Sequence, residues 1–245
     1  MRNKISVSED FYSIQGEGTY MGYPAVFLRL SGCNLMCGGQ GTQFDGELHN
    51  NATWRCDTID VWMKGVSQSI TDLVMHFHEA GYIAHLLKGA HLVVTGGEPT
   101  LQEGALIDFL DTLKKDVPRL FVEVETNGTI VPSEELALEV NHWNISPKLA
   151  NSGNSFNTRF NHRAVDYFKQ QKSVCWKFVI ANQDDLEEVL DTYQVSQQKM
   201  YLMPACESVE EYEKVAPIVA NLAMEYHIKF SSRLQVNIWD KTTGV

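Results

Sequence analysis

Short runs of β-branched and aromatic residues recur along the chain, and segments with helical spacing lie between them. Ile70, Leu73, Val74 and Phe77 follow the i, i+3, i+4, i+7 pattern of a helix with one buried face. The strand-like runs cover residues 24–32, 91–95, 120–124, 142–145, 174–180, 199–203 and about 229–238. Strands that alternate with helices form parallel sheets, because each helix crosses over between neighbouring strands. The pattern predicts an α/β fold of about six βα units, but it does not distinguish an open sheet from a barrel.

Further helices are indicated by spacing and by capping residues. Ile107, Leu110 and Leu113 lie three residues apart, as on one face of a helix. Ser133 and Ser208 are each followed by acidic residues, so each offers a capping oxygen at the start of a helix. These signals fill the gaps between the predicted strands.

The composition fits a single soluble domain that spans residues 1–245. With 44% hydrophobic and 21% charged residues, the chain is long enough for one barrel-sized domain. Its formal charge of −11 argues against a nucleic-acid partner, which calls for a basic face. The N-terminus lacks an apolar run and no long apolar stretch follows, so neither secretion nor membrane spanning is indicated. We expect a cytoplasmic protein that handles small molecules.

Three of the five cysteines lie on one predicted loop, just after the strand at residues 24–32. Cys33 and Cys37 are close together, and Cys56 follows after an eighteen-residue excursion. This grouping suits a metal or redox site better than a set of disulfides. Three thiolates can hold three irons of a [4Fe-4S] cluster and leave the fourth iron open. The alternative is a zinc site that His49 completes.

Motifs along almost the whole chain then narrow the interpretation. The segments FYSIQGEGTYMGYPAVFLRLSGCNLMC, TGGEPTLQ, ETNGT, SPK and RLQVNIWDKTTGV occur in this order. Together they resemble the 7-carboxy-7-deazaguanine synthase (QueE) family of radical S-adenosylmethionine (SAM) enzymes. GGEP or QGEG alone would be weak evidence, but their ordered combination is specific.

The chain departs from this family in its cysteine motif. The family has CxxxCxxC with an aromatic residue before the last cysteine, whereas here residues 38–55 separate Cys37 from Cys56 and Arg55 stands before Cys56. The adjacent Trp54 could supply the missing ring. Because the entropy of loop closure grows slowly with length, we interpret the excursion as an insertion that leaves the three sulfurs in place. The alternative is a chain that has lost the cluster.

The resemblance implies a partial, TIM-like (β/α)6 barrel of the radical SAM type, with a loop insertion in the cluster-binding loop. Cys33, Cys37 and Cys56 would hold the [4Fe-4S] cluster, whose open iron would bind SAM. The residues expected to contact SAM are Arg55, Asp57, Gly96, Gly97, Glu98, Glu125, Asn127, Ser146, Pro147, Lys148, Met203 and Pro204.

Several of these residues also have plain structural interpretations. Gly96 and Gly97 could form a simple strand-to-helix turn, although such a turn does not explain Glu98. Asn127 could simply shape a turn with the glycine that follows it, and Met203 could fill the core. Cys175, within a predicted strand, and Cys206 are expected to carry no ligand.

The family's substrate is 6-carboxy-5,6,7,8-tetrahydropterin, and the resemblance assigns its recognition to polar groups near the N-terminus and at the end of the chain. The expected contacts are Ile14, Gln15, Gly16, Glu17, Arg29, Thr95 and the terminal carboxylate of Val245. Thr58 would bind Mg²⁺ through its hydroxyl, since hard cations favour oxygen ligands. From the residues alone, Arg29 would be a solvated or paired charge, Thr58 a loop or cap residue and Thr95 an ordinary strand residue.

The expected reaction is that of a carbon–nitrogen lyase. A radical abstracts hydrogen from C6 of the pterin, and ring contraction with loss of ammonia gives 7-carboxy-7-deazaguanine, a precursor of queuosine. The resemblance also implies a homodimer and an electron donor of the flavodoxin type. The alternatives are a radical SAM activase, disfavoured by Gln15, Glu17 and Arg29, and a degenerate interaction protein. The sequence identifies neither the destination of the product nor the physiological reductant.

Overall fold

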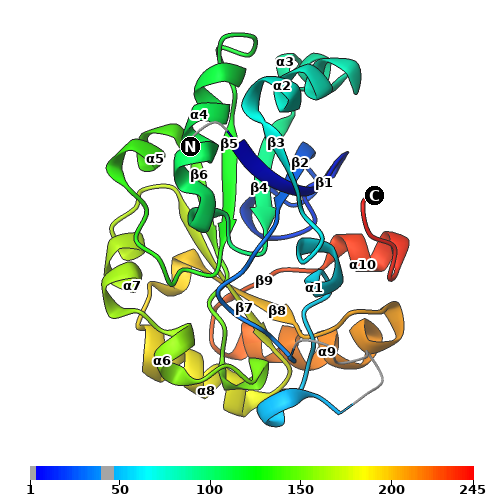
Figure 1. Ribbon diagram of the computed structural model, residues 1–245. Helices are drawn as coiled ribbons and strands as arrows, with labels where there is room; N and C mark the ends of the chain where they lie inside the picture. Colours follow the sequence, from blue (N-terminus) through cyan, green and yellow to red (C-terminus); the bar gives the residue numbers. More distant parts are fainter. Residues whose placement is uncertain (1–3, 40–46) are drawn as a thin grey trace.

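A single curved sheet organises the molecule, with helices around its outside (Figure 1). The structure, a computed structural model, describes residues 4–39 and 47–245. Within these residues the sheet has nine strands in the order β3-β1-β2-β4-β5-β6-β7-β8-β9. β2 and the strands from β4 to β9 pair in parallel with their neighbours. At one edge, β1 pairs antiparallel with β2, and β3 pairs antiparallel with β1.

The strands follow the predicted order, with two additions at the edge. Their bounds are β1 Lys4–Ile14, β2 Pro24–Leu30, β3 Val66–Ser69, β4 His91–Gly96, β5 Val122–Thr126, β6 His142–Ile145, β7 Val174–Ile180, β8 Met200–Pro204 and β9 Lys229–Phe230. The two end strands, β3 and β9, are not paired with each other, so the described sheet is an open one. The prediction of a repeating βα fold with a mostly parallel sheet is therefore confirmed.

The helices α1 to α9 lie between successive strands along the chain, and α10 follows the last strand. They are α1 Ile59–Trp62, α2 Ile70–Glu79, α3 Tyr82–Leu87, α4 Glu103–Leu113, α5 Glu134–Glu139, α6 Phe156–Arg159, α7 His162–Lys169, α8 Gln183–Tyr193, α9 Val209–Glu225 and α10 Leu234–Trp239. The predicted caps are present: Ser133 accepts a hydrogen bond from the Leu136 amide, and Ser208 accepts one from the Glu211 amide. Among the described residues, no helix combines the length and apolar character that crossing a bilayer requires.

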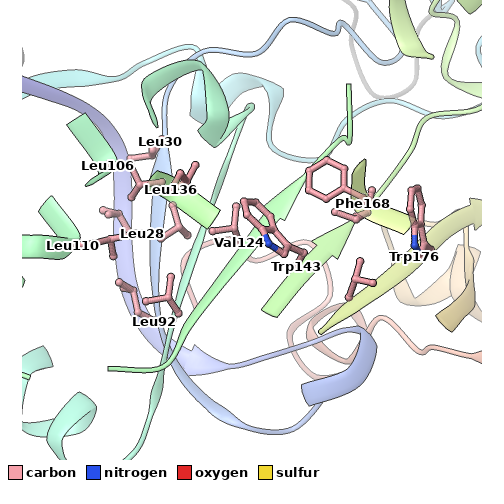
Figure 2. Packing of buried hydrophobic residues seen from close by; sticks show 14 of the residues in the cluster. Leu28, Leu30, Leu92, Leu106, Leu110, Val124, Leu136, Trp143, Phe168 and Trp176 are labelled. Atoms are coloured by element: carbon pink, nitrogen blue, oxygen red, sulfur yellow. The ribbon is translucent and has the colours of Figure 1, made fainter. Parts of the chain in front are cut away.

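The main hydrophobic core lies between the sheet and these helices (Figure 2). Leu106 and Leu110 of α4 pack toward Leu28 of β2, and Trp143 of β6 lies beside Phe168 of α7. All five side chains are buried. Burial of this apolar surface fixes the strands in place, and with them the loops at their carboxyl ends.

The sequence prediction was wrong at both ends of the chain. β1 was not predicted, and the strand expected at about residues 229–238 is only β9, followed by the short helix α10. A segment of six or seven residues with alternating apolar positions fits either period, so tertiary contacts decide its conformation. Here the Leu234 amide donates to the Gly16 carbonyl, which holds the start of α10 against the segment that follows β1.

Candidate active site

A cavity of about 760 Å³ opens at the carboxyl ends of the parallel strands. Its walls come from residues of β1, β2, β4, β5, β7 and β8, from the segments that follow β1, β2, β4, β5, β6 and β8, and from the C-terminal residues. Ligand sites of open α/β sheets lie at this edge, because the loops after parallel strands meet there. The cavity is therefore the candidate active site.

All three cysteines of the predicted cluster line this cavity. Cys33 follows β2, and the Cys56 amide donates to the Cys37 carbonyl at 3.1 Å, which joins the two ends of the excursion. All three thiols are free. The structure therefore brings Cys56 back beside Cys37 despite the eighteen residues between them.

The segment at residues 150–154, after β6, holds the excursion closed. The Gly38 amide donates to the Ser152 carbonyl, the Thr53 amide donates to the Asn151 carbonyl, and the Trp54 indole Nε1 donates to Asn151 Oδ1 at 2.9 Å. Because both arms of the excursion bind the same short segment, the intervening chain does not determine where Cys56 lies. Residues 40–46 of the predicted insertion lie outside the described residues.

The chemistry of these thiols fits an iron-sulfur cluster. Burial raises the pKa of Cys33 to about 12 and that of Cys37 to about 11, so both thiolates need a bound cation to compensate their charge. Within residues 4–39 and 47–245, no three His, Cys, Asp or Glu side chains are arranged to hold one metal ion. Thiolates on a single zinc lie within about 4 Å of one another, whereas a four-iron cluster distributes them over separate irons.

The zinc alternative with His49 finds no support in this arrangement. His49 does not line the cavity, and its ring packs so closely on Gly39 that a Cβ there would lie 2.4 Å from the imidazole. Gly39 and His49 therefore form a packing contact at the base of the excursion.

The GGEP segment brings β4 against the cysteine loop. A Cβ on Gly97 would lie 2.0 Å from the Gly32 carbonyl oxygen and 2.8 Å from Cys33 Cβ, so only glycine permits this approach. Gly96 has a φ of 141° and is equally close to the backbone of Leu30. Both glycines line the cavity.

Glu98 is not among the residues that line the cavity. The carboxylate is fully buried and accepts from the Thr100 amide and hydroxyl, the Thr126 hydroxyl and the Asn127 amide. Burial raises the pKa of Glu98, although these hydrogen bonds oppose the shift. Through these hydrogen bonds, Glu98 joins the turn after β4 to the turn after β5.

A buried lysine lies between two carboxylates at the centre of the cavity. Lys177 of β7 is 2% exposed, and its Nζ lies 2.9 Å from Glu17 Oε2 and 3.0 Å from Glu125 Oε1. Thr95 donates to Glu125 Oε2, and Gln15 donates weakly to Glu125 Oε1 at 3.4 Å. Residues expected from distant motifs are thus joined in one network.

Glu17, like Glu125, accepts hydrogen bonds from three side chains among the described residues. Its Oε1 accepts from Arg233 Nε at 3.2 Å and from Gln235 Nε2 at 2.8 Å. Burial would raise the pKa of Glu17, but Lys177 and Arg233 outweigh that effect and lower it to about 2. Glu17 is therefore an anion at any physiological pH.

Arg29 of β2 and the end of the chain form a neighbouring part of the wall, since Arg29 is paired in register with Thr95 of β4. Arg29 Nε lies 2.7 Å from Glu9 Oε1, and its guanidinium lies over the Phe11 ring. Among the described residues its two Nη groups have no hydrogen-bond acceptor, and they remain able to bind a ligand anion. The last five residues, including Val245, also line the cavity.

Most of the predicted site residues line this cavity, and three do not. Those that do are Ile14, Gln15, Gly16, Glu17, Arg29, Cys33, Cys37, Arg55, Cys56, Asp57, Thr58, Thr95, Gly96, Gly97, Glu125, Asn127, Ser146, Lys148, Met203 and Val245. Glu98, Pro147 and Pro204 are absent from the wall. The two prolines therefore act through the backbone turns that carry Lys148 and Ala205 into it.

Sequence reasoning missed three polar residues of the site: Lys177, Arg233 and Gln235. A lysine within the strand VCWKFVI was the available signal for the first, because an unpaired charge is rarely placed among buried strand residues. Arg233 also binds Asp57 and the Cys206 carbonyl. Arg233 lies in the segment predicted to be a strand, at about residues 229–238, and that prediction did not indicate that its side chain lines the cavity.

We predict that Lys177→Met destabilises the protein by about 3–5 kcal/mol, because it removes the buried cation that pairs with both Glu17 and Glu125 and leaves Glu17 with Arg233. The pKa of Glu17 is about 2 when folded against 4.5 as the reference value, so its stabilisation is complete above pH 4.5 and is lost as the pH falls toward 2. The variant should lose most of this acid-side dependence. Urea denaturation at several pH values measures both effects.

Lys214→Met is the matched control, since Lys214 pairs with Glu210 on an exposed helix face. We expect little change in stability for this variant. Equal effects of the two substitutions would contradict the role given to the Lys177 network.

The comparisons with known proteins agree with this geometry. No protein-family model matches the chain. The 7-carboxy-7-deazaguanine synthase of Pyrobaculum aerophilum is 31% identical over 246 residues, which cover 98% of this chain and 97% of that protein. The 7-carboxy-7-deazaguanine synthase of Halobacterium salinarum is 28% identical and covers 96% of this chain and 91% of its own.

The fold is shared with a solved structure. The crystal structure of QueE from Escherichia coli superposes with a TM-score of 0.61 at 21% identity, covering 94% of this chain and 93% of that one. The predicted fold class is thereby confirmed. Full-length similarity above 30% identity, together with the shared fold, shows that the chain belongs to the 7-carboxy-7-deazaguanine synthase family.

Proposed function

We propose that this chain is a 7-carboxy-7-deazaguanine synthase, a lyase that contracts the ring of 6-carboxy-5,6,7,8-tetrahydropterin with loss of ammonia. One observation carries the proposal: three free cysteines from one loop face the same cavity as a network of buried carboxylates and cations. The first group suits a cluster with an open iron, and the second suits a polar substrate. The convergence of Cys56 with Cys37 argues against a degenerate relative that has lost its cluster.

Cys33, Cys37 and Cys56 would hold the [4Fe-4S] cluster. When bound, the cluster and SAM supply the 5′-deoxyadenosyl radical that starts the reaction. The residues around this position must orient SAM and exclude water. Trp54 lies in the cavity wall with Lys148 Nζ 5.7 Å from its ring centre, and this pair offers an aromatic face and a cation beside the cysteines.

The remaining SAM contacts would come from the ends of the next strands. The Gly97 backbone packs directly on the Cys33 loop, and its neighbour Glu98 holds the Asn127 turn in place. Ser146 accepts a hydrogen bond from Lys148 at 2.9 Å, and both side chains face the cavity with Met203. The direct contact between Glu98 and the amino group of SAM receives no support, since its carboxylate lies outside the wall.

The substrate's polar edge and its carboxylate match two different groups in the cavity, the carboxylate network and Arg29. Glu17 and Glu125 both bind Lys177, and their carboxylate oxygens present acceptors to the amino and ring N–H groups of a pterin. Arg29 offers paired donors to a carboxylate. The two carboxylates of the network repel the substrate carboxylate, which sets the direction in which the ring enters.

Thr58 is proposed as the Mg²⁺ ligand. Its side chain makes no capping hydrogen bond at the start of α1, and its hydroxyl lies 3.5 Å from Cys56 Sγ at the cavity wall. Mg²⁺ at this position would lie next to the cluster loop and take its other ligands from substrate oxygens and water. A cytoplasmic location, a flavodoxin-type electron donor and a homodimer are further proposals that follow from the family.

A first prediction concerns the third cysteine. After anaerobic reconstitution, the wild-type chain should bind about four irons and convert the carboxytetrahydropterin in the presence of SAM, Mg²⁺ and reductant. Cys56→Ala should bind less iron and lose turnover by at least about 100-fold, since one of three cluster bonds is gone. Iron analysis and product formation measure the two effects.

Cys175→Ser provides the control, because it removes a buried thiol elsewhere and keeps a donor for Asn144 Oδ1. This variant should retain iron and activity. Equal iron content and turnover in Cys56→Ala and wild type would refute the ligand assignment.

A second prediction concerns the end of the chain. Extension by a few residues moves the terminal carboxylate away from Val245 and should raise KM for the pterin by about tenfold, the loss expected for one charge-assisted hydrogen bond. Iron content and SAM binding should not change. An unaltered KM would remove Val245 from the substrate site.

A further inference from the structure

Each of the three cluster cysteines has a polar neighbour on its sulfur. The Leu35 amide donates to Cys33 Sγ at 3.4 Å, Asn154 Nδ2 donates to Cys37 Sγ at 3.3 Å, and the Thr58 hydroxyl lies beside Cys56 Sγ. The first and third neighbours belong to the cysteine loop itself. Asn154 comes from the far side of the cavity, after β6, and no motif singled it out.

The orientation of the Asn154 amide is fixed by its other partners. Its Oδ1 accepts from the Met36 amide at 3.1 Å, and because a backbone N–H can only donate, the oxygen must face Met36. The NH₂ group is then left to face Cys37. Its second hydrogen is directed to Ser152 Oγ at 3.1 Å. The amide is therefore held with an N–H directed at the sulfur.

The surroundings favour a strong effect of this hydrogen bond. Cys37 is 5% exposed, so little water competes for its sulfur. In a site of low local dielectric, a fixed N–H dipole acts on the charge of the sulfur with less screening than at a surface. Hydrogen bonds to cluster sulfurs are among the factors that set reduction potentials.

We propose that Asn154 is a positioning residue that raises the reduction potential of the [4Fe-4S] cluster through its N–H···S hydrogen bond to Cys37. Reduction adds one electron to the cluster and its thiolates, and the N–H dipole stabilises this more negative state. Asn154 thereby makes the cluster easier to reduce by the electron donor. The inference rests on the proposed function, because it requires the cluster.

The test compares two substitutions at Asn154 by anaerobic redox titration of the reconstituted protein, followed by electron paramagnetic resonance of the reduced cluster. Asn154→Leu removes the donor and should lower the equilibrium constant for reduction about tenfold, which is about 59 mV for one electron. Asn154→Asp keeps the acceptor for the Met36 amide and sets a carboxylate against the sulfur. It should lower the equilibrium constant further.

Asn50→Asp is the matched control. Asn50 lies on the excursion and its Nδ2 donates to the Gly153 carbonyl at 3.2 Å, so this change makes the same substitution at a contact with residues 150–154 without touching a sulfur. Its potential should equal that of the wild type. The proposal is supported if the Asn50→Asp cluster has the wild-type potential, the clusters of both Asn154 variants have lower potentials, and all proteins bind their full iron content.

Other outcomes overturn it in distinguishable ways. Unchanged potentials in both Asn154 variants with full iron content would refute the tuning role and leave the proposed function intact. Loss of iron in both Asn154 variants, but not in Asn50→Asp, would assign Asn154 a purely structural role. A wild-type chain that takes up no iron would refute both the inference and the cluster on which it rests.

Discussion

The site depends on one constraint: Cys56 must return to Cys37 after a long departure of the chain. The entropic cost of closing this loop is moderate, because it grows slowly with loop length. This entropy does not determine where Cys56 lies relative to Cys37. The short segment at residues 150–154 determines that position by binding the Gly38 amide, the Thr53 amide and the Trp54 indole. Because this segment follows β6, the core that fixes the strand also fixes the third cysteine. The excursion can then vary in length without moving the cluster position.

The carboxylate network imposes a second constraint, which is charge balance in a confined space. Lys177 pairs with Glu17 and Glu125, and Arg233 pairs with Glu17 and Asp57. Ion pairs at this depth cost desolvation energy, so they are weak evidence for stability and better evidence for a site prepared to receive a polar ligand. The arrangement joins residues from β1's end, β5, β7 and the C-terminal segment. Substrate recognition and the fold of the last twenty residues are therefore linked.

The sequence predicted the alternation of strands and helices, and most of the residues it named line one cavity, because glycine, cysteine and acidic motifs follow strand ends that parallel topology brings together. It did not predict Lys177, since a strand pattern shows that a residue is buried but not which partners face it. Glu98 belongs to the expected motif, but its carboxylate is buried in hydrogen bonds from Thr100 and Thr126 and is not among the residues that line the cavity. Arg233 was hidden because RLQVNIW fits both strand and helix periods. Asn154 carries no motif, and only the three-dimensional contact with Cys37 reveals it.

The most direct measurement of the central claim is an anaerobic crystal structure of the iron-reconstituted protein with iron anomalous scattering. The account predicts a four-iron cluster bonded to the sulfurs of Cys33, Cys37 and Cys56, with the fourth iron facing the cavity. It also predicts that the Trp54 indole remains bound to Asn151. A map with a single metal ion at these thiols, or with Cys56 directed away from Cys33 and Cys37, would contradict it.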